Sequence, residues 1–320
     1  AAEALRILDI AIDRGCHGEF AAVTRAKTLE ILGRNEEAQR IRAELIRKGA
    51  RNAAVYHGEA LSLLRRRRPD PVRALEFLDM VDRLQCADEY TTSIRANALE
   101  LAGRGDEASQ LRMQQIESGS YSEVFYTDEA DWQLTKKSPD VEEAMRILAL
   151  AEARGCATDY TVSVQAKALQ AAGRTEEASA LRQQQIAAGS TNAVFFVAEA
   201  HWQLHKHDAE AAIRILDLAS QRGCSDEHAA SVRASALEAL GRHREASELR
   251  TTLISSGSRS AAIYNAEADW LLSQEPPRID EALKLLAVPL RDGFADQFTT
   301  WVEAKARRLL SDRMGTDSPR

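Results

Sequence analysis

The sequence has few aromatic residues, few prolines, few cysteines and no long apolar run. Its 320 residues include 7 Pro and 4 Cys, and aromatic residues make up 5%. No run of about 18 apolar residues is present to span a bilayer, and the N-terminal residues lack the charged and then apolar profile of a signal peptide. We therefore expect a cytoplasmic protein with no membrane partner.

The sequence also lacks an excess of positive charge. It has 42 Lys and Arg against 49 Asp and Glu, which gives a formal net charge of -7. Domains dedicated to nucleic acids usually carry surplus Lys and Arg, because these residues displace counterions from phosphates. The charge balance argues against such a role.

Catalytic motifs are missing as well. There is no phosphate-cradling glycine loop, no GxSxG elbow and no HExxH helix in the sequence. His201 and His205 are one helical turn apart, but no Cys or carboxylate completes a repeated metal-ligand pattern. We expect no enzyme activity, no catalytic residue, no cofactor and no metal site.

What the sequence does have is a repeat of about 70 residues. The four cysteines Cys16, Cys86, Cys156 and Cys224 occupy one equivalent position in successive repeats. Glycines recur with the same steps, and one such series is Gly33, Gly103, Gly173 and Gly241. Self-similarity at this period is typical of stacked supersecondary units. Cysteines so far apart cannot form disulfides or a zinc site, so we expect free buried thiols.

Each repeat divides into two related halves, and each half contains two helical stretches. Apolar residues follow helical spacing, as in Ala144, Ile147, Leu148 and Ala151, and glycines stand where helices end. Prolines such as Pro69 and Pro139 fall in the loops. The pattern predicts about 18 helices and no strand, which is an all-α solenoid of about nine helical hairpins in a double repeat.

The predicted solenoid covers residues 1–311. Its units are expected at about 1–69, 70–139, 140–207, 208–277 and 278–311, and residues 312–320 are expected to be a C-terminal tail. Residues 1–16 match the second helix of a hairpin whose first helix is absent, so we expect further repeats or another domain before them. The composition, rich in Ala and Arg, suggests a bacterial source.

Four segments carry a family resemblance: LGRNEEAQRI, AGRGDEASQL, AGRTEEASAL and LGRHREASEL. In each, an alanine follows another small residue by twelve places, as Ala38 follows Ala26. With the aromatic residues Tyr56, Tyr126, Phe196 and Tyr264, each four before an alanine, the chain resembles tetratricopeptide repeats. The resemblance implies a right-handed superhelix of helical hairpins whose concave face binds a protein or peptide.

The chain departs from this family at one position, where charged or polar residues replace the usual Leu. These residues are Arg25, Glu59, Arg95, Glu129, Gln165, Glu199, Arg233, Glu267 and Glu303. Equivalent positions on packed neighbouring helices are roughly 8 to 10 Å apart, so side chains of opposite charge can pair. We expect an ion ladder along the first helices of the hairpins, with a gap at Gln165.

The concave face predicted from the resemblance supplies the candidate partner-binding residues. They are Tyr90, Arg95, Asn97, Thr127, Asp131, Tyr160, Ser163, Lys167, His201 and His228. Aromatic residues mixed with polar groups suit a peptide partner. Terminal repeats could also join two copies into a homo-oligomer.

Two alternatives to a protein-binding scaffold stay open. The segments also resemble pentatricopeptide repeats, which would make the chain a reader of single-stranded RNA. The specificity positions of that family would fall on Ser163 with Asn192 and on Asn265 with Asp296. The other alternative is an accessory or oligomerising region of an enzyme such as a glycosyltransferase.

Overall fold

The computed structural model describes residues 1–16 and 18–316, and these residues form 18 α-helices with no strand. The helix count and the all-α class predicted from the sequence are confirmed. The chain separates into two compact units, Ala1–Ala172 and a second one that begins at Gly173. We describe each unit by itself.

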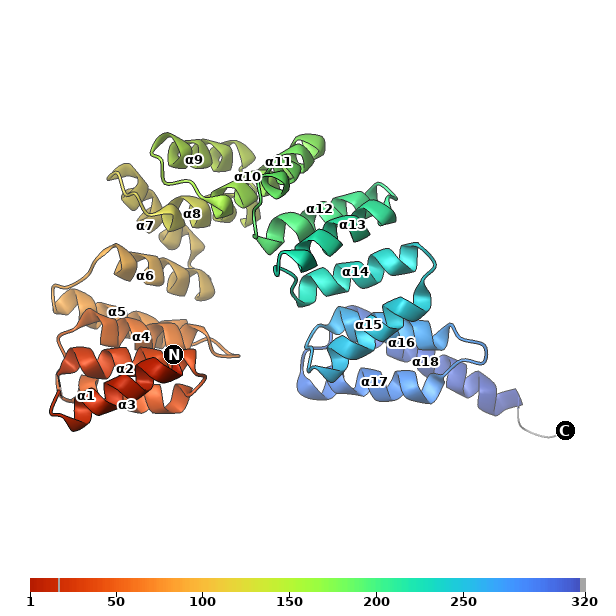
Figure 1. Cartoon of the computed structure of the whole chain (residues 1–320), viewed down its shortest axis with the longest axis horizontal. Helices are drawn as coiled ribbons and strands as arrows, with labels where there is room; N and C mark the ends of the chain where they lie inside the picture. Colours follow the sequence, from red (N-terminus) through yellow and green to blue (C-terminus); the bar gives the residue numbers. More distant parts are fainter. Residues whose placement is uncertain (17, 317–320) are drawn as a thin grey trace. The chain divides into compact units, whose positions relative to one another are not determined.

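The first unit contains ten helices (Figure 1). They are α1 (Ala2–Asp13), α2 (Glu19–Ile31), α3 (Asn35–Arg47), α4 (Ala53–Leu64), α5 (Pro71–Arg83), α6 (Glu89–Leu101), α7 (Gly105–Glu117), α8 (Glu123–Thr135), α9 (Val141–Ala153) and α10 (Asp159–Ala171).

The second unit contains eight helices. They are α11 (Thr175–Ala187), α12 (Ala193–His205), α13 (Ala209–Gln221), α14 (Glu227–Ala239), α15 (His243–Ser255), α16 (Ala261–Leu272), α17 (Ile279–Asp292) and α18 (Gln297–Thr316).

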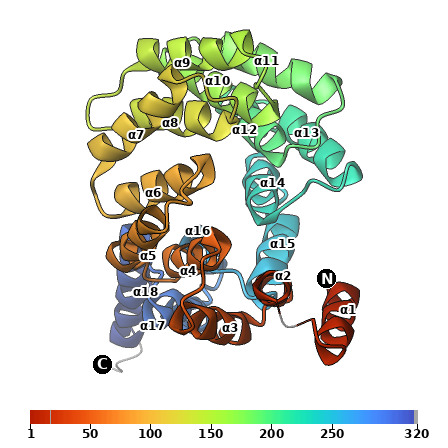
Figure 2. The ribbon, with the colours of Figure 1, turned by 90° about the vertical axis from the view of Figure 1, so that its left-hand side faces the viewer.

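Within each unit successive helices pair as hairpins, from α2 with α3 to α8 with α9 in the first and from α12 with α13 to α16 with α17 in the second. We call the even-numbered helices A helices and the odd-numbered helices B helices. Neighbouring A helices also pack side by side, as α4 does with α6 and α12 with α14. Figure 2 shows the hairpins of the first unit following one another from α2 to α6. This arrangement is the α-solenoid of tetratricopeptide-like hairpins expected from the sequence.

Capping and turn residues set the helix boundaries. Most A helices begin after a side chain that accepts a backbone N–H, as Asp88 and Thr158 do in capping boxes. B helices that follow a Gly-Arg turn begin differently, since Arg174 has no capping bond and pairs with Glu177 instead. Gly173 precedes that turn with φ +76°, where a side chain would be strained.

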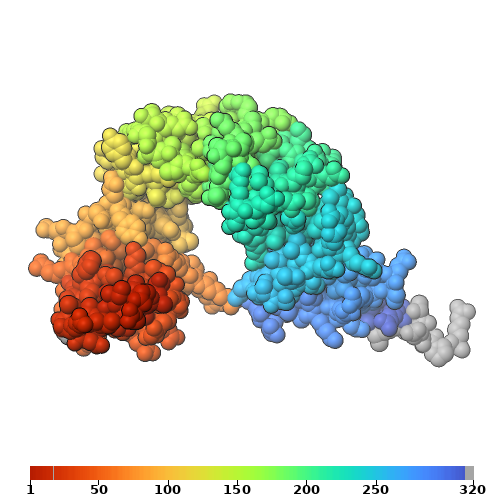
Figure 3. Space-filling view, viewed as in Figure 1, coloured from red at the N-terminus to blue at the C-terminus, as the bar shows by residue number. Residues whose placement is uncertain are grey.

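The core lies in thin layers between helices rather than in one central body. The paired alanines expected to allow close approach are buried, as in the cluster of Ala96, Leu99 and Ala108. The aromatic anchor Tyr126 is also buried, and its hydroxyl donates to the Ser120 carbonyl at 2.6 Å. Figure 3 shows side chains filling the spaces between the ribbons of successive hairpins within each unit.

The cysteines are less buried than expected. Cys16 is exposed, which contradicts the prediction for that residue, and Cys86, Cys156 and Cys224 are half-buried. The latter three pack at the end of a B helix, where each thiol lies near the carbonyl five residues earlier, at 3.2 Å from Cys224 to Ala219. Their place at a helix end explains the recurrence without a metal or redox role.

The buried charges form a repeated pair that the sequence analysis did not predict. Glu59, Glu129, Glu199 and Glu267 on A helices each accept a hydrogen bond from an arginine on the B helix just before them, and the pairs are Arg42–Glu59, Arg112–Glu129, Arg182–Glu199 and Arg250–Glu267. Donor to acceptor distances run from 2.9 to 3.1 Å. All eight side chains are buried, so each pair compensates for the water that both ions lose.

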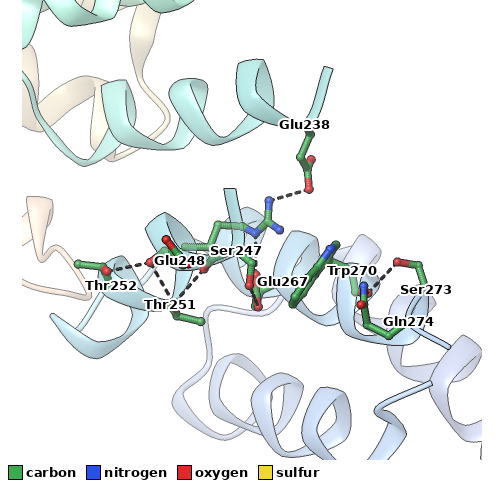
Figure 4. Close-up of polar contacts among 10 residues, drawn as sticks. Glu238, Ser247, Glu248, Thr251, Thr252, Glu267, Trp270, Ser273 and Gln274 are labelled. Atoms are coloured by element: carbon green, nitrogen blue, oxygen red, sulfur yellow. Dashed lines mark hydrogen bonds and ion pairs between the residues drawn. The ribbon is translucent and has the colours of Figure 1, made fainter. Parts of the chain in front are cut away.

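Figure 4 shows one of these networks in the second unit. Ser247 donates a second bond to Glu267, at 2.6 Å, and Glu238 accepts from Arg250 at 2.7 Å. An arginine between two carboxylates connects α14, α15 and α16. Arg250 therefore connects its own hairpin, formed by α14 and α15, to the next hairpin, which begins with α16.

The network around Glu199 is the densest. Four side chains donate to this carboxylate, and they are Ser179, Arg182, Gln183 and Gln203. Burial by itself raises the pKa of Glu199, but the hydrogen bonds outweigh burial and hold the pKa below its ordinary value. The carboxylate is thus kept ionised in the interior.

The predicted ion ladder between A helices is wrong. Arg95 bonds Asp79 and Asp82 on α5, at 2.7 and 2.6 Å, and does not reach Glu59 or Glu129. Arg25 and Arg233 likewise pair with an aspartate on the preceding B helix. Each of these arginines pairs with the B helix of the preceding hairpin, because that helix offers a carboxylate closer than the neighbouring A helix does.

Ion pairs between neighbouring A helices do exist, two residues further along the helix than the ladder residues. Lys167 on α10 pairs with Asp131 on α8, and Lys305 on α18 pairs with Asp269 on α16. Lys167 and Asp131 were both predicted to lie on the binding face.

The arginine that is missing at Gln165 is matched by an aspartate that is missing on the preceding B helix, α9. Arg25, Arg95 and Arg233 find their partner sixteen residues earlier, and at the place that corresponds to Gln165 the partner position is Ala149. The arginine and its aspartate are therefore absent together. This explains why no uncompensated charge is buried there.

At the C-terminal end, α18 continues to Thr316, past the boundary that the sequence analysis placed at residue 311. Of the expected tail, residues 317–320 lie outside the described residues. Pro289 lies inside α17, which nevertheless runs to Asp292.

The buried pair predicts a specific pattern of stability. Arg250→Met should lower the free energy of unfolding by about 3 kcal/mol or more, because it leaves Glu267 buried without its cation. Arg250→Met combined with Glu267→Leu should recover most of that loss, since Leu is the residue that the resembled family carries at this position. Urea unfolding of the wild type and both variants measures this; a double variant no more stable than the single one contradicts it.

The second prediction concerns the gap in the first unit. Gln165→Arg alone should gain little, because Ala149 offers no carboxylate, although Glu152 stands where Asp82 assists Arg95. Ala149→Asp together with Gln165→Arg should show a favourable coupling of about 0.5 to 1 kcal/mol in a double-mutant cycle. A coupling of zero would mean that the pairs seen at Arg95 and Arg233 do not set the local stability.

Candidate partner-binding face

The exposed sides of the A helices carry a row of apolar residues, one near the start of each helix. In the first unit the row is Phe20, Ala54, Tyr90, Val124 and Tyr160, and in the second it is Val194, His228, Ala262 and Phe298. Tyr90, Val124 and Tyr160 remain 54%, 42% and 48% exposed. We call this side of the A helices the A face. Large apolar side chains left open on consecutive helices are typical of a binding surface.

Bonds between neighbouring A helices hold the start of each helix in place. Glu19 accepts the backbone N–H of Asn52 at 2.9 Å, which connects α2 with α4. His57 bonds Thr91 at 2.8 Å and meets the Tyr90 ring edge-on, which connects α4 with α6. The starts of α4 and α6, which carry Ala54 and Tyr90, are thus each fixed by contacts with the previous A helix.

The helices α6, α8 and α10 and their caps also carry seven carboxylates, of which Glu100 is paired with Arg112 and Glu123 accepts from Thr161. They are Asp88, Glu89, Glu100, Glu123, Asp128, Asp131 and Asp159. The nearby cation Lys167 is paired with Asp131, and Arg95 points away toward α5. This part of the A face therefore has a surplus of negative charge.

Asp128 is the least compensated of these carboxylates. It is half-buried on α8, and no hydrogen bond or ion pair to it is found among the described residues. Burial raises its pKa to about 6; the Arg112 guanidinium opposes the shift, and Glu100 and Asp131 add to it. Burial also raises the pKa of Tyr160, followed by the charges of Asp128, Asp131 and Glu123.

A hollow of about 860 Å³ opens on the A face between α2, α4 and the start of α6. Its floor includes Gly58 and Arg42, and its rim includes Lys27, Arg66 and Tyr90. The other repeats have Asp128, Ala198 and Ala266 where α4 has Gly58. A Cβ at Gly58 would lie 3.0 Å from Cδ of Arg42, so the glycine leaves the arginine open to the hollow.

Most residues predicted for the binding face are accessible. Tyr90, Asn97, Tyr160, Lys167, His201 and His228 are exposed, and Asp131 and Ser163 are half-buried. They belong to A helices, and Tyr160 and Ser163 are neighbours on α10, where the Ser163 hydroxyl donates to the Tyr160 carbonyl at 2.7 Å. Their role in binding stays a prediction.

Two of the predicted residues do not fit. Thr127 is fully buried, and its hydroxyl donates to the Glu123 carbonyl of its own helix at 3.1 Å. Arg95 is held by α5 and lines a smaller hollow with residues of α5 and α7. Arg95 is thus turned toward the B helix α5, and Thr127 has no exposed surface to offer a partner.

The histidines of the second unit do not form a metal site. His201 on α12 and His228 on α14 have ring centroids 5.8 Å apart. Burial lowers the pKa of His201, and the neighbouring His228 and His205 lower it further. No group of three His, Cys, Asp or Glu side chains that could hold a metal occurs among the residues that the structure describes.

The structure argues against Asn265 with Asp296, one of the two residue pairs expected to read RNA bases. Asn265 is 1% exposed and donates to Asp296 at 3.0 Å, and Asp296 in turn caps α18 by accepting the N–H of Thr299. A buried side chain already bonded to its partner cannot read a base. Capping accounts for Asp296.

The sequence analysis missed the hollow and the carboxylate at Asp128. The available signal was the position itself, because Gly58, Asp128, Ala198 and Ala266 differ at one place in otherwise similar helices. The variation among Gly, Ala and Asp marks a half-buried position where the repeats differ in chemistry. The raised pKa depends on neighbours from three helices and could not be found from spacing.

The surplus charge predicts a stability change that depends on pH. Above about pH 6 Asp128 is ionised in a site that disfavours its charge, so Asp128→Ala should stabilise the fold there by about 1 to 3 kcal/mol. As pH falls through about 6 the native carboxyl takes up its proton, and the gain should vanish near pH 4. Urea unfolding across this range tests it. A gain that is the same at every pH would contradict the raised pKa.

Comparison with known proteins shows the fold alone. No profile of a known protein family and no curated protein sequence matches the chain. Yeast Tom70 aligns with a TM-score of 0.69 at 16% identity, over 89% of this chain and 60% of that one. The APC/C hetero-tetramer Cut9-Hcn1 gives 0.55 at 15% identity, over 94% and 58%.

A human IFIT1 dimer with PPP-AAAA gives a TM-score of 0.54 at 16% identity, over 93% of this chain and 64% of that one. The chain thus spans less than two thirds of the length of each of these three proteins. None of its helices over the described residues is long and apolar enough to cross a bilayer. The chain has the fold of tetratricopeptide-like helical repeat proteins.

Proposed function

We propose that the chain is a non-catalytic interaction scaffold that binds a segment of a partner protein along the A face. The observation that carries the proposal is the row of exposed apolar side chains on consecutive A helices, led by Tyr90, Val124 and Tyr160. Aromatic residues dominate the energetics of protein interfaces, because they bury large areas at low cost in side-chain entropy.

The architecture supports the same proposal. The hairpins repeat the A face from one helix to the next, so a partner segment can lie across several helices and gain contacts from each. Among proteins of this fold, Cut9 is found with Hcn1 in a hetero-tetramer, and IFIT1 is found as a dimer. By analogy the terminal repeats of this chain could join two copies.

The finer parts of the proposal follow from the sequence. We infer a cytoplasmic, bacterial protein. The accessory role beside an enzyme such as a glycosyltransferase has no observation in the structure that favours it.

Single-stranded RNA is the second candidate partner. It is favoured by the likeness to IFIT1 in the structure with PPP-AAAA. Against it stand the net charge of -7 and the carboxylates around Tyr90 and Tyr160, which repel a phosphate backbone. We rank protein partners first.

Parallel selections distinguish the two partners. A displayed library of random peptides and a pool of randomised single-stranded RNA are each selected on the intact chain, and we expect enrichment of peptides only. Val124→Ser should weaken the selected peptides by about tenfold, since it removes an exposed apolar contact on the A face. The matched control Val72→Ser, at an exposed valine on the B helix α5, should leave binding unchanged.

The opposite outcomes are equally clear. Strong enrichment of one RNA sequence would replace the protein scaffold with an RNA reader. Equal loss for Val72→Ser and Val124→Ser would remove the A face from the proposal.

A further inference from the structure

The A face differs in charge along the first unit. Around the hollow beside α2 and α4, the cations Lys27, Arg65 and Arg66 balance the nearby acids. Over α6, α8 and α10 the balance is lost, because Lys167 and Arg95 are both engaged by aspartates. The exposed apolar residues Tyr90, Val124 and Tyr160 lie within this acidic part.

The arginine below this surface cannot supply the missing charge. Arg112 is 1% exposed, its Nε donates to Glu129 at 2.9 Å, and its Nη1 faces Glu100 at 2.9 Å. Two carboxylates therefore share one cation, and Asp128 is left above them. Lys136 donates to Gln133 near the C-terminal end of α8, far along the helix from Val124.

We propose that the A face of α6, α8 and α10 binds a basic segment that has an aliphatic side chain at about every third position and Lys or Arg between them. Its aliphatic side chains would pack on Tyr90, Val124 and Tyr160, and its cations would pair with Glu89 and Asp128. This inference rests on the scaffold function proposed above and names the chemistry of the partner.

Charge complementarity predicts that the partner segment is positively charged. A cation beside Asp128 would enter a half-buried place where the carboxylate has no hydrogen bond or ion pair within the described residues, so the new pair is screened less than one in open water. An acidic segment or a phosphate backbone would add like charges to the seven carboxylates already there. The apolar row supplies the contact area that charge alone does not.

The distance between neighbouring A helices predicts how often an aliphatic residue should recur in the bound segment. Packed helix axes are roughly 8 to 10 Å apart, and a segment in the polyproline II conformation rises about 3.1 Å per residue with about three residues per turn. About three residues of such a segment therefore pass each A helix, and every third side chain returns to the same side of the segment. Every third side chain should be aliphatic, and the residues between them are free to carry cations.

Asp128 gives the interaction a pH signature. Its pKa of about 6 in the free protein means that it is neutral in mild acid, with Arg112, Glu100, Asp131 and Tyr160 as the charged or titratable groups around it. A cation pairs with the ionised form only. Binding should therefore strengthen as pH rises through about 6.

The test uses three fluorescein-labelled synthetic peptides and the intact chain, with anisotropy as the readout. The first peptide is four Leu-Lys-Ser triplets, the second has Glu in place of Lys, and the third has Ser in place of Leu. We expect the first to bind and the other two to bind at least about tenfold more weakly, because each lacks one of the two complementary features.

Two variants and their controls connect binding to the site. Asp128→Asn should weaken the Leu-Lys-Ser peptide about fivefold or more at pH 7.5 and remove its loss of affinity near pH 5. Asp280→Asn, an exposed aspartate on the B helix α17, should leave the affinity and its pH dependence unchanged. Thermal unfolding confirms that each variant is folded.

Several results would overturn the inference. If the Glu peptide binds as tightly as the Lys peptide, or if Asp128→Asn and Asp280→Asn behave alike, the partner is not a basic segment at this place. If none of the three peptides binds while the random library yields binders that depend on Val124, the scaffold function stands and this inference fails. If neither experiment yields binders, both are wrong.

Discussion

The buried arginine–glutamate pair is the interaction on which this solenoid depends. In four repeats a glutamate on an A helix accepts from an arginine on the preceding B helix, and both side chains are almost fully buried. An ion in such a place is costly without its partner, so the pair admits one register of hairpin on hairpin. The tetratricopeptide family, which the chain resembles, has an apolar Leu at the glutamate position. A Leu would pack in several positions.

The same constraint explains what is left open on the surface. Because Arg95 and Arg112 are paired with carboxylates of adjacent hairpins and Lys167 is paired with Asp131, few cations remain to balance the carboxylates near Tyr90 and Tyr160. Asp128 stays half-buried with a raised pKa, at a position where sister repeats have Gly or Ala. A residue that weakens the fold at neutral pH and faces a row of exposed apolar side chains suits a binding role.

Gly58 shows how one position diversifies the repeats. Without a Cβ it opens a hollow above Arg42, whereas Asp128 at the same place adds charge and Ala198 adds little. The scaffold around it is nearly constant, since the caps, paired alanines and ion pairs recur. Different repeats can therefore present different chemistry to successive parts of one partner.

The sequence by itself determined the helices, because period, caps and glycine turns act within about ten residues of each other. It also predicted the close approach at Ala96 and Ala108 and the exposure of Tyr90 and Tyr160. The partners of the charges were decided only by tertiary structure. Arg95 and Glu129 share an equivalent place in their helices, yet one bonds Asp79 and the other Arg112, since each side chain reaches the nearest opposite charge that the packing of B helices provides.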